Sequence, residues 1–251
     1  MIEKMGILQE RRVSVSRAEV AAARDPAIQF LARAQFRTSV AELHQLPPPV
    51  GREVAFAGRS NAGKSSALSA LARRRNLAFV SKTPGRTQLI NYFGLDETCA
   101  LVDLPGYGYA AAPGPVRNNW QALVGGYLAG RENLAGLVLL MDARHPFTPL
   151  DQQLLAWFAP RDLPVHILLT KSDKLTPRQS KETLMGARKT LSTLLPQATL
   201  QLFSSLTKAG IVEAAQRVAV WLRPEVFQLS PEPQPDAVHK KPPVKGEETG
   251  G

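Results

Sequence analysis

Six short and largely apolar segments recur along the chain, and each has the length of a β-strand. Two of them, 137–141 and 165–169, show no alternation of polar and apolar residues, which is typical of parallel strands buried on both faces. The other four segments are 53–57, 89–95, 99–102 and 200–203. Helical patterns cover 66–72, 116–128, 150–158, a stretch that begins at Thr176-Pro177, and a last stretch that ends at Trp221. This order predicts an α/β fold with a mostly parallel six-stranded sheet and helices on both faces.

The two ends of the chain differ from this middle part. We expect residues 1–50 to form an N-terminal extension that holds a short helix, before Pro47, Pro48 and Pro49 break any helix and lead into the first strand. Residues 51–226 form the expected folded domain. Residues 227–251 are rich in proline, lysine and glutamate with little to bury, and we expect a disordered tail.

A glycine-rich turn lies between the first strand and the first helix of this domain. Its residues are Gly58, Arg59, Ser60, Asn61, Ala62, Gly63, Lys64 and Ser65. They match G-x-x-x-x-G-K-S in the strand–turn–helix context that a phosphate-binding loop requires. The glycines let backbone N–H groups surround a polyphosphate, Lys64 would neutralise its β- and γ-phosphates, and the Ser65 hydroxyl would bind Mg²⁺.

Two further segments fit the requirements of a nucleotide switch. The polar loop 81–88 holds Thr83 and Thr87, either of which could offer a hydroxyl to Mg²⁺. The strand 99–102 ends in Asp103, Leu104, Pro105 and Gly106, where the carboxylate can hold Mg²⁺ through water and the glycine N–H can approach the γ-phosphate. We therefore take Lys64 and Gly106 as candidate catalytic residues and Ser65 and Asp103 as candidate Mg²⁺ ligands, while either Thr83 or Thr87 could supply the further hydroxyl.

The choice of base is predicted from the ends of the last two strands. Asp173 can accept hydrogen bonds from the N1–H and the 2-amino group of guanine, which adenine does not offer in that arrangement. The aliphatic stem of Lys171 can cover the base. A backbone N–H near Ser205 could donate to guanine O6. His166 lies inside a predicted buried strand, where we expect a hydrogen-bonded core residue.

Composition narrows the function further. A single cysteine, Cys99, excludes an internal disulfide framework. The sequence shows no apolar run of membrane-spanning length and no secretory signal, so we expect a cytoplasmic protein that has no membrane partner. Residues 51–230 carry 21 Lys and Arg against 12 Asp and Glu, which accounts for most of the net charge of +10. A basic folded domain favours an anionic partner such as RNA, although a phosphate site and general solubility explain the charge equally well.

The segments GRSNAGKSS, TPGRTQ, DLPGYGYA, TKSDK and SSLTKAG resemble the five nucleotide motifs of the EngB family of bacterial ribosome-assembly GTPases. This family lies in the TrmE-Era-EngA-EngB-septin-like class. The resemblance implies a Ras-like P-loop domain, GTP or GDP with Mg²⁺, a role in maturing the large ribosomal subunit and its rRNA, and a link to cell division and septation. It also implies that Ser65 and Thr87 are Mg²⁺ ligands, which makes Thr87 a candidate catalytic residue as well. Beyond the glycine-rich loop, it implies that the nucleotide contacts are Gly85, Arg86, Thr87, Gln88, Leu89, Asp103, Leu104, Pro105, Gly106, Thr170, Lys171, Ser172, Asp173, Phe203, Ser204 and Ser205.

Two positions depart from the Ras pattern, and a third matches related GTPases. The guanine motif begins with Thr170 rather than Asn, and its shorter, single-atom contact predicts a modest affinity for the base. Tyr107 follows the D-x-x-G motif, where Ras-type enzymes use Gln to orient the attacking water, so we expect slow hydrolysis without a partner. Asn61 matches the asparagine that holds K⁺ in related cation-activated GTPases, and K⁺ beside it is our hypothesis; the alternative is that Asn61 only shapes the loop.

Three functions remain open. The first is a GTP-driven switch that hydrolyses GTP to GDP and phosphate. The second is an RNA- or ribosome-binding module that needs bound GTP but no hydrolysis. The third, a small-molecule nucleotide kinase, is disfavoured because no acceptor-binding lid is evident. For the oligomeric state we expect a monomer.

Overall fold

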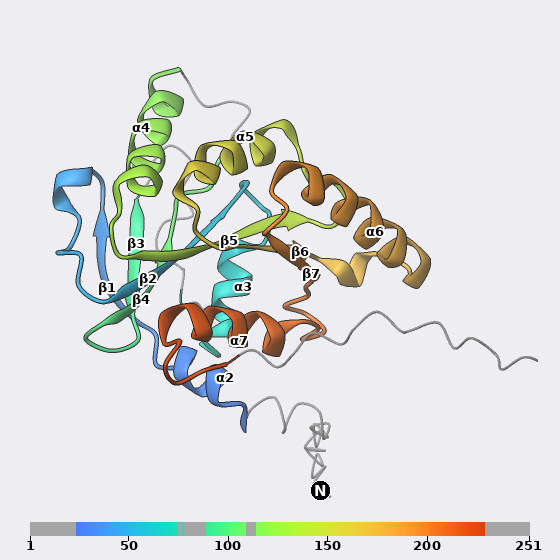
Figure 1. Cartoon of the computed structure of the whole chain (residues 1–251), viewed down its shortest axis with the longest axis horizontal. Helices are drawn as coiled ribbons and strands as arrows, with labels where there is room; N and C mark the ends of the chain where they lie inside the picture. Colours follow the sequence, from blue (N-terminus) through green and yellow to red (C-terminus); the bar gives the residue numbers. More distant parts are fainter. Residues whose placement is uncertain (1–23, 75–76, 78–88, 109–113, 229–251) are drawn as a thin grey trace, which may run out of the picture.

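The computed structural model describes residues 24–74, 77, 89–108 and 114–228 (Figure 1). A seven-stranded sheet runs through the centre in the order β1-β3-β4-β2-β5-β6-β7. Its strands are β1 (Gln35–Val40), β2 (Arg52–Gly58), β3 (Ile90–Gly94), β4 (Cys99–Asp103), β5 (Leu134–Asp142), β6 (Val165–Thr170) and β7 (Thr199–Leu202). Strands β2, β4, β5, β6 and β7 pair in parallel, whereas β3 is antiparallel to both β4 and β1.

Helices cover both faces of the sheet. One face packs against α4 (Gly114–Gly130), α5 (Pro149–Phe158) and α6 (Pro177–Leu194), and the other against α2 (Pro26–Leu31), α3 (Lys64–Leu71) and α7 (Ile211–Leu222). Three short 3-10 turns complete the described elements: η1 (Leu43–Gln45), η2 (Ala159–Arg161) and η3 (Ser172–Lys174). The predicted mostly parallel α/β fold is confirmed.

The pleat of the strands divides the core between these two faces. In β2, Ala55 and Ala57 belong to the core beneath α4 and α5, while Val54 and Phe56 belong to the core beneath α3 and α7. All four side chains are buried. Burial on both faces explains why the strands are apolar without alternation.

The sheet has seven strands instead of the predicted six, because β1 adds to its edge. The expected short helix of the N-terminal extension is α2, and the chain then forms β1 before the proline run. The carboxylate of Asp25 caps α2 by accepting hydrogen bonds from the backbone N–H groups of Ala27 and Ile28, at 2.9 and 3.2 Å.

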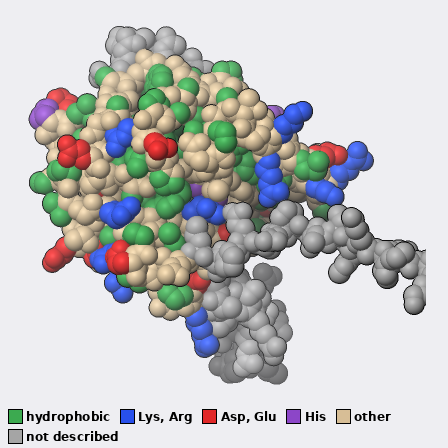
Figure 2. All heavy atoms as spheres, viewed as in Figure 1, with side chains coloured by type: hydrophobic (Ala, Val, Ile, Leu, Met, Phe, Trp, Pro, Cys, Tyr) green, Lys and Arg blue, Asp and Glu red, His purple; other side chains and the backbone are tan. Residues whose placement is uncertain are grey.

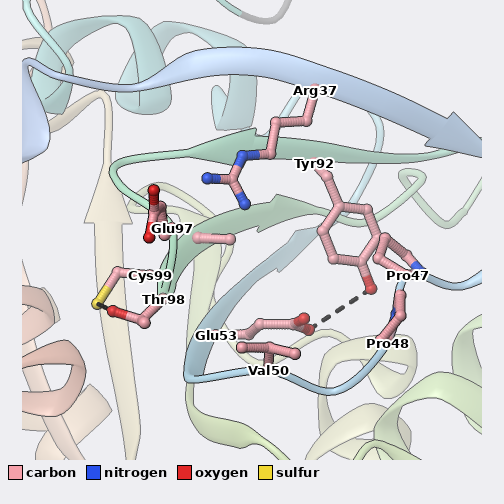
Figure 3. Close-up of a pocket in the computed structure, with 10 residues that line it drawn as sticks. Arg37, Pro47, Pro48, Val50, Glu53, Tyr92, Glu97, Thr98 and Cys99 are labelled. Carbon is pink, nitrogen blue, oxygen red and sulfur yellow. Dashed lines mark hydrogen bonds between the residues drawn. The ribbon is translucent and has the colours of Figure 1, made fainter.

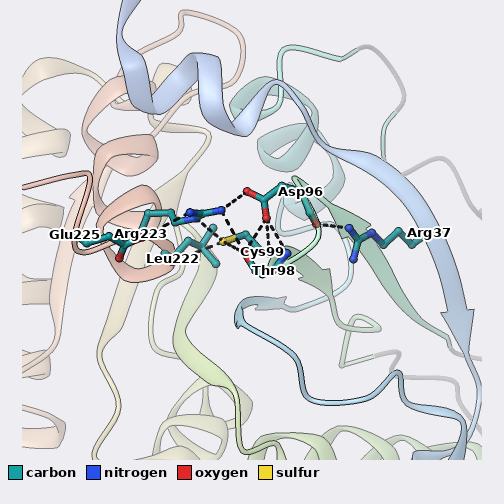
Figure 4. Close-up of polar contacts among 7 residues, drawn as sticks. All are labelled: Arg37, Asp96, Thr98, Cys99, Leu222, Arg223 and Glu225. Carbon is teal, nitrogen blue, oxygen red and sulfur yellow. Dashed lines mark hydrogen bonds and ion pairs between the residues drawn. The ribbon is translucent and has the colours of Figure 1, made fainter.

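A polar cluster ties the end of α7 to the turn between β3 and β4 (Figure 4). The Arg223 guanidinium donates to Asp96 Oδ2 at 2.7 Å and to Cys99 Sγ at 3.2 Å. Asp96 also accepts hydrogen bonds from the backbone N–H groups of Thr98 and Cys99. Burial raises the pKa of the Cys99 thiol, so this cysteine is a packed core residue with little thiolate character.

Candidate functional site

The glycine-rich loop joins the end of β2 to the start of α3. Gly63, at the N-cap of α3, has φ +92°, and Asn61 has φ +63°. A Cβ at Gly58 would lie 2.8 Å from the backbone oxygen of Leu140 in β5. Glycine at 58 and 63 is therefore required by the close approach of β5 and by the left-handed backbone, respectively.

Lys64 begins α3 and forms an ion pair with Asp103 at the end of β4. Both side chains are nearly buried, with exposed fractions of 12% and 7%. Residues predicted separately, one for phosphate and one for Mg²⁺, thus lie in direct contact. A polyphosphate in the loop would compete with Asp103 for the Lys64 ammonium.

The segment after Asp103 lies against the glycine-rich loop. The Leu104 N–H donates to Phe56 O at 3.0 Å, and the Ser60 N–H donates to Tyr107 O at 2.7 Å. A Cβ on Gly106 would lie 3.3 Å from Ser60 N, a tight contact that glycine avoids. The structure therefore brings the D-x-x-G segment and the phosphate loop together as predicted.

Tyr107 does not face the loop. Its side chain is only 5% exposed, and its hydroxyl donates to Asp151 Oδ1 in α5 at 2.6 Å. Its ring lies 5.5 Å from the ring of Trp120, measured between centroids. Burial and the neighbouring Asp151 carboxylate raise the pKa of Tyr107 well above its usual value. In this arrangement the phenol cannot orient a water at the phosphate loop.

The residues predicted to read the base lie at the ends of β6 and β7. The Thr170 hydroxyl donates to Ala62 O at 2.6 Å and lies 3.0 Å from Met141 O, so it joins the base-reading segment to the phosphate loop. Lys171 Nζ donates to Asn61 O at 2.6 Å and pairs with Asp142 Oδ2 at 2.9 Å.

Asp173 is held in place by the last predicted motif. The Ser204 hydroxyl donates to Asp173 Oδ1 at 2.6 Å and accepts hydrogen bonds from the N–H groups of Leu206 and Thr207. The Ser172 N–H donates to Phe203 O at 3.2 Å. These bonds orient the carboxylate whose second oxygen, Oδ2, lies 3.9 Å from Lys174 Nζ. The side chain of Asp173 is 11% exposed, so it is partly desolvated and still accessible.

Two functional candidates, Asp151 and Asp142, were missed by the sequence analysis. Asp151 accepts a hydrogen bond from the Tyr107 hydroxyl, and Asp142 at the end of β5 forms an ion pair with Lys171. Hydrogen bonds from Arg144, followed by the contact with Lys171, lower the pKa of Asp142 far below its usual range. Each aspartate lies in a segment without a recognised motif. Each reaches the site only because the fold places the end of β5 and the start of α5 beside the phosphate loop and the segment after Asp103.

Several predicted residues fall outside this constellation. Thr83, Gly85, Arg86, Thr87 and Gln88 lie outside the described residues, and the half-buried Leu89 directly precedes β3. Asn61 and Ser65 are exposed at the loop. The structure thus joins four of the five predicted segments at the carboxyl ends of the parallel strands.

The oxygen atoms available as metal ligands at this edge of the sheet fit Mg²⁺ better than a metal bound by protein side chains alone. No group of three or more His, Cys, Asp or Glu side chains that could hold a metal occurs among the described residues. Asp103 and Ser65 offer hard oxygen atoms beside the phosphate loop, and Mg²⁺ is usually bound by one or two protein oxygens together with water and phosphate.

A separate pocket of about 250 Å³ lies at the opposite end of the sheet (Figure 3). Arg37, Pro47, Glu53, Tyr92 and Cys99 are among the residues that line it. Its carboxylates, Glu53 and Glu97, cannot donate hydrogen bonds to a phosphate, and it contains no glycine-rich turn. We therefore do not assign it to a nucleotide.

Comparisons with known proteins place the chain among GTPases. The sequence model of the family described as "50S ribosome-binding GTPase" matches residues 53–171. The probable GTP-binding protein EngB of Aromatoleum aromaticum is 58% identical over 189 residues, covering 75% of this chain and 88% of that protein. The corresponding protein of Thiobacillus denitrificans is 56% identical over 201 residues, covering 80% and 97%.

Solved structures support the same fold. A crystal structure of a probable GTP-binding protein engB has a TM-score of 0.56 at 21% identity and covers 68% of this chain and 99% of that one. Era in complex with MgGDPNP and nucleotides 1506–1542 of 16S ribosomal RNA has a TM-score of 0.54 at 20% identity, covering 73% and 60%. At these identities the likeness concerns the fold alone.

Proposed function

This chain belongs to the EngB family of GTP-binding proteins, whose members hydrolyse GTP, and from that premise we propose that it is a slow, cytoplasmic, monomeric GTPase switch in assembly of the large ribosomal subunit. A role in cell division and septation, direct or through ribosome supply, is part of the same proposal. The GTP-bound form would bind an rRNA-containing precursor, and hydrolysis would release it.

The observation that carries this proposal is the convergence of four segments at one edge of the sheet. The phosphate loop, the segment that starts at Asp103, and the segments around Asp173 and Ser204 meet there through direct contacts. We propose that Asp173 reads guanine, that Ser204 holds its carboxylate, and that the stem of Lys171 covers the base.

In hydrolysis, a water attacks the γ-phosphorus of GTP, and the bond to the β-phosphate oxygen breaks to give GDP and phosphate. Lys64 would bind the β- and γ-phosphates, and the Gly106 N–H would donate to the γ-phosphate. Ser65, Asp103 and Thr87 would hold Mg²⁺, which neutralises phosphate charge when bound. We propose that K⁺ beside Asn61 supplies the further positive charge.

Slow hydrolysis follows from the direction of the Tyr107 side chain. Its hydroxyl is bound to Asp151 in the interior, so among the described residues it leaves no side chain in the Gln position to orient the water. This observation also favours a second candidate function, a GTP-dependent ribosome-binding module in which hydrolysis is dispensable. Growth of a depleted strain on a variant that binds GTP without hydrolysing it would favour the module, and failure to grow would favour the switch.

Nucleotide titration tests the base assignment first. Fluorescent GDP, GTP and ATP analogues are titrated onto the wild-type protein, Asp173→Asn and Asp162→Asn. The last variant is a matched control, since Asp162 is exposed and its φ of +49° suits asparagine. We expect a strong guanine preference that collapses only in Asp173→Asn. Equal ATP binding in the wild type would contradict the assignment.

Two further measurements test the rest of the proposal. Sedimentation with purified large subunits, with GDP or a non-hydrolysable GTP analogue, should show binding that is stronger with the analogue. Hydrolysis rates measured in K⁺ and in Na⁺ buffers test the ion. If the rates in the two buffers were equal, both in the presence and in the absence of subunits, the K⁺ hypothesis would be refuted.

A further inference from the structure

The outward face of α6 carries a concentration of positive charge. Arg178, Lys181, Arg188 and Lys189 are all exposed. At about 100° per residue, their spacing places all four within about 100° of the helix circumference. The space-filling view shows Lys and Arg side chains gathered over the side of the molecule where α6 lies (Figure 2).

Little negative charge offsets these cations. Glu182 is the one carboxylate in α6, and it pairs with Arg178 at 2.8 Å. Among the residues that the structure describes, no carboxylate lies within ion-pair distance of Lys181, Arg188 or Lys189. Three cations of this face are therefore available to an external anion.

The inner face of α6 fixes the helix to the domain. Ala187 and Leu191 are buried, and Leu184 packs against the same core as α4 and α5. Thr176 caps the first turn by accepting a hydrogen bond from the Gln179 N–H. The cations thus project from a rigid element, which lowers the entropy lost when they bind a partner.

We propose that the outward face of α6 binds the phosphate backbone of RNA, as the contact through which this protein holds the ribosomal precursor. The inference rests on the proposed function. Arg178 and Arg188 are ten residues apart, about 15 Å along a helix, which is long enough to follow several consecutive phosphates. An anionic membrane is the weaker fit, because a membrane-surface helix inserts a broad apolar face. The apolar face of α6 packs on the core through Leu184, Ala187 and Leu191, which leaves Met185 and Leu194 as its exposed large apolar side chains.

This surface lies beside the nucleotide site without being part of it. Helix α6 begins four residues after Asp173, and none of its cations contacts the phosphate loop in the described structure. We therefore expect α6 to supply affinity for RNA in both nucleotide states, while the loops near the γ-phosphate supply the difference between them.

Charge removal tests the proposal. The variant Lys181→Gln/Arg188→Gln/Lys189→Gln is compared with Arg24→Gln/Arg33→Gln/Arg52→Gln, which removes three exposed cations near α2 and at the start of β2. The first probe is a fluorescent 20-base-pair RNA duplex, titrated between 50 and 200 mM KCl. The second is sedimentation with purified large subunits. Unchanged GDP affinity and unfolding midpoint confirm that each variant is folded.

We expect the α6 variant to lose about tenfold or more in affinity for both probes, and its salt dependence to weaken by about two to three released ions. The control should behave like the wild type. Equal binding by both variants would overturn the inference while leaving the proposed function intact. If the α6 variant lost affinity for the RNA duplex but the wild type did not bind subunits, α6 would be supported as an RNA-binding surface and the ribosomal role would be overturned. If the α6 variant lost binding only to phosphatidylglycerol vesicles and kept its affinity for RNA, the RNA proposal would be overturned in favour of a membrane partner.

Discussion

Tyr107 lies next to the predicted phosphate loop, but its side chain points away from that loop. It occupies the position directly after the D-x-x-G motif, where Ras-type enzymes carry the residue that orients the attacking water. Here the backbone of Tyr107 contacts the phosphate loop, while its side chain points to α5 and is buried there. Asp151 accepts its hydroxyl and also accepts hydrogen bonds from the N–H and hydroxyl groups of Thr148. The phenol therefore fixes the segment after the D-x-x-G motif to the cap of α5.

We predict that Tyr107→Phe leaves single-turnover GTP hydrolysis unchanged and lowers the free energy of unfolding by about 1–3 kcal/mol, because Asp151 loses a buried donor. Tyr107→Gln should not accelerate hydrolysis, since its side chain would occupy the same interior position. Quench-flow kinetics and urea unfolding measure the two effects. A clear acceleration in Tyr107→Gln would show that the side chain can turn to the nucleotide.

His166 is a buried residue whose hydrogen bonds define its neutral form. Its Nδ1 lies 2.8 Å from Thr199 Oγ1, and its Nε2 lies 2.8 Å from Gln201 Oε1. Gln201 is oriented by donating from Nε2 to Gly210 O at 2.7 Å. Since Oε1 can only accept, Nε2 of the histidine carries the proton and the threonine hydroxyl donates to Nδ1. The predicted core role of this histidine is confirmed.

Burial, helped by the Arg217 charge, lowers the pKa of His166 from 6.5 to about 4. Between these values the unfolded chain binds a proton that the folded chain does not, so stability falls as pH decreases from about 6.5 to about 4. The loss reaches about 3 kcal/mol at the lower limit. Urea unfolding of the wild type and His166→Leu at pH 7 and 5 measures it. The variant should lose less stability between the two pH values, and an identical loss would exclude His166 as the source.

At the scale of elements, one buried ion pair joins three parts of the chain. Glu53 in β2 accepts hydrogen bonds from Arg131, just after α4, at 2.5 and 2.9 Å, and from Tyr127 in α4 at 2.9 Å. Arg131 also donates to Pro47 O, which anchors the proline run that leads into β2. The pair therefore fixes the chain at the end of the sheet opposite the nucleotide site.

Arg131→Met should destabilise the protein by about 3–5 kcal/mol, because it leaves the Glu53 carboxylate buried without its cation. The control is Arg144→Met, which removes a partner of Asp142 at a solvent-exposed pair and should destabilise the protein far less, because water screens that interaction. Denaturant unfolding of both variants measures the difference. If the double variant Glu53→Gln/Arg131→Met were no more stable than Arg131→Met, the unpaired carboxylate would not be the cause.

The elements also show which features a sequence pattern can predict. Continuous apolar runs identified β5 and β6, because both faces of these strands are buried. Strand β1 was missed because only Val40 among its six residues is buried, so no period of two is visible. The motifs located the phosphate loop and the base-reading segments. Asp142 and Asp151 could not be located in this way, because the contacts that bring them to the site, with Lys171 and Tyr107, are with residues 29 and 44 positions away in sequence.

At the scale of the whole molecule, the ends of β2, β4, β6 and β7 meet at the proposed nucleotide site. The Lys64–Asp103 pair joins the first two strands, Thr170 joins β6 to the phosphate loop, and Ser204 joins the segment after β7 to Asp173. Helices from both faces contribute to the same fold, and no helix in the described residues is long and apolar enough to cross a lipid bilayer. A ligand that contacts all four strand ends should therefore stabilise the domain as one unit.

We predict that GDP at 100 times its dissociation constant stabilises the protein by about 2.7 kcal/mol, which raises the unfolding midpoint by about 5–10 °C in a domain of this size. ADP at the same concentration should have no effect, and Asp173→Asn should lose the response to GDP while Asp162→Asn keeps it. Thermal unfolding followed by circular dichroism and by tryptophan fluorescence measures both the shift and its cooperativity. The two signals should move together, since Trp120, Trp157 and Trp221 lie on opposite faces of the sheet. A shift in only one signal would mean that the nucleotide orders its own loops without stabilising the sheet that carries them.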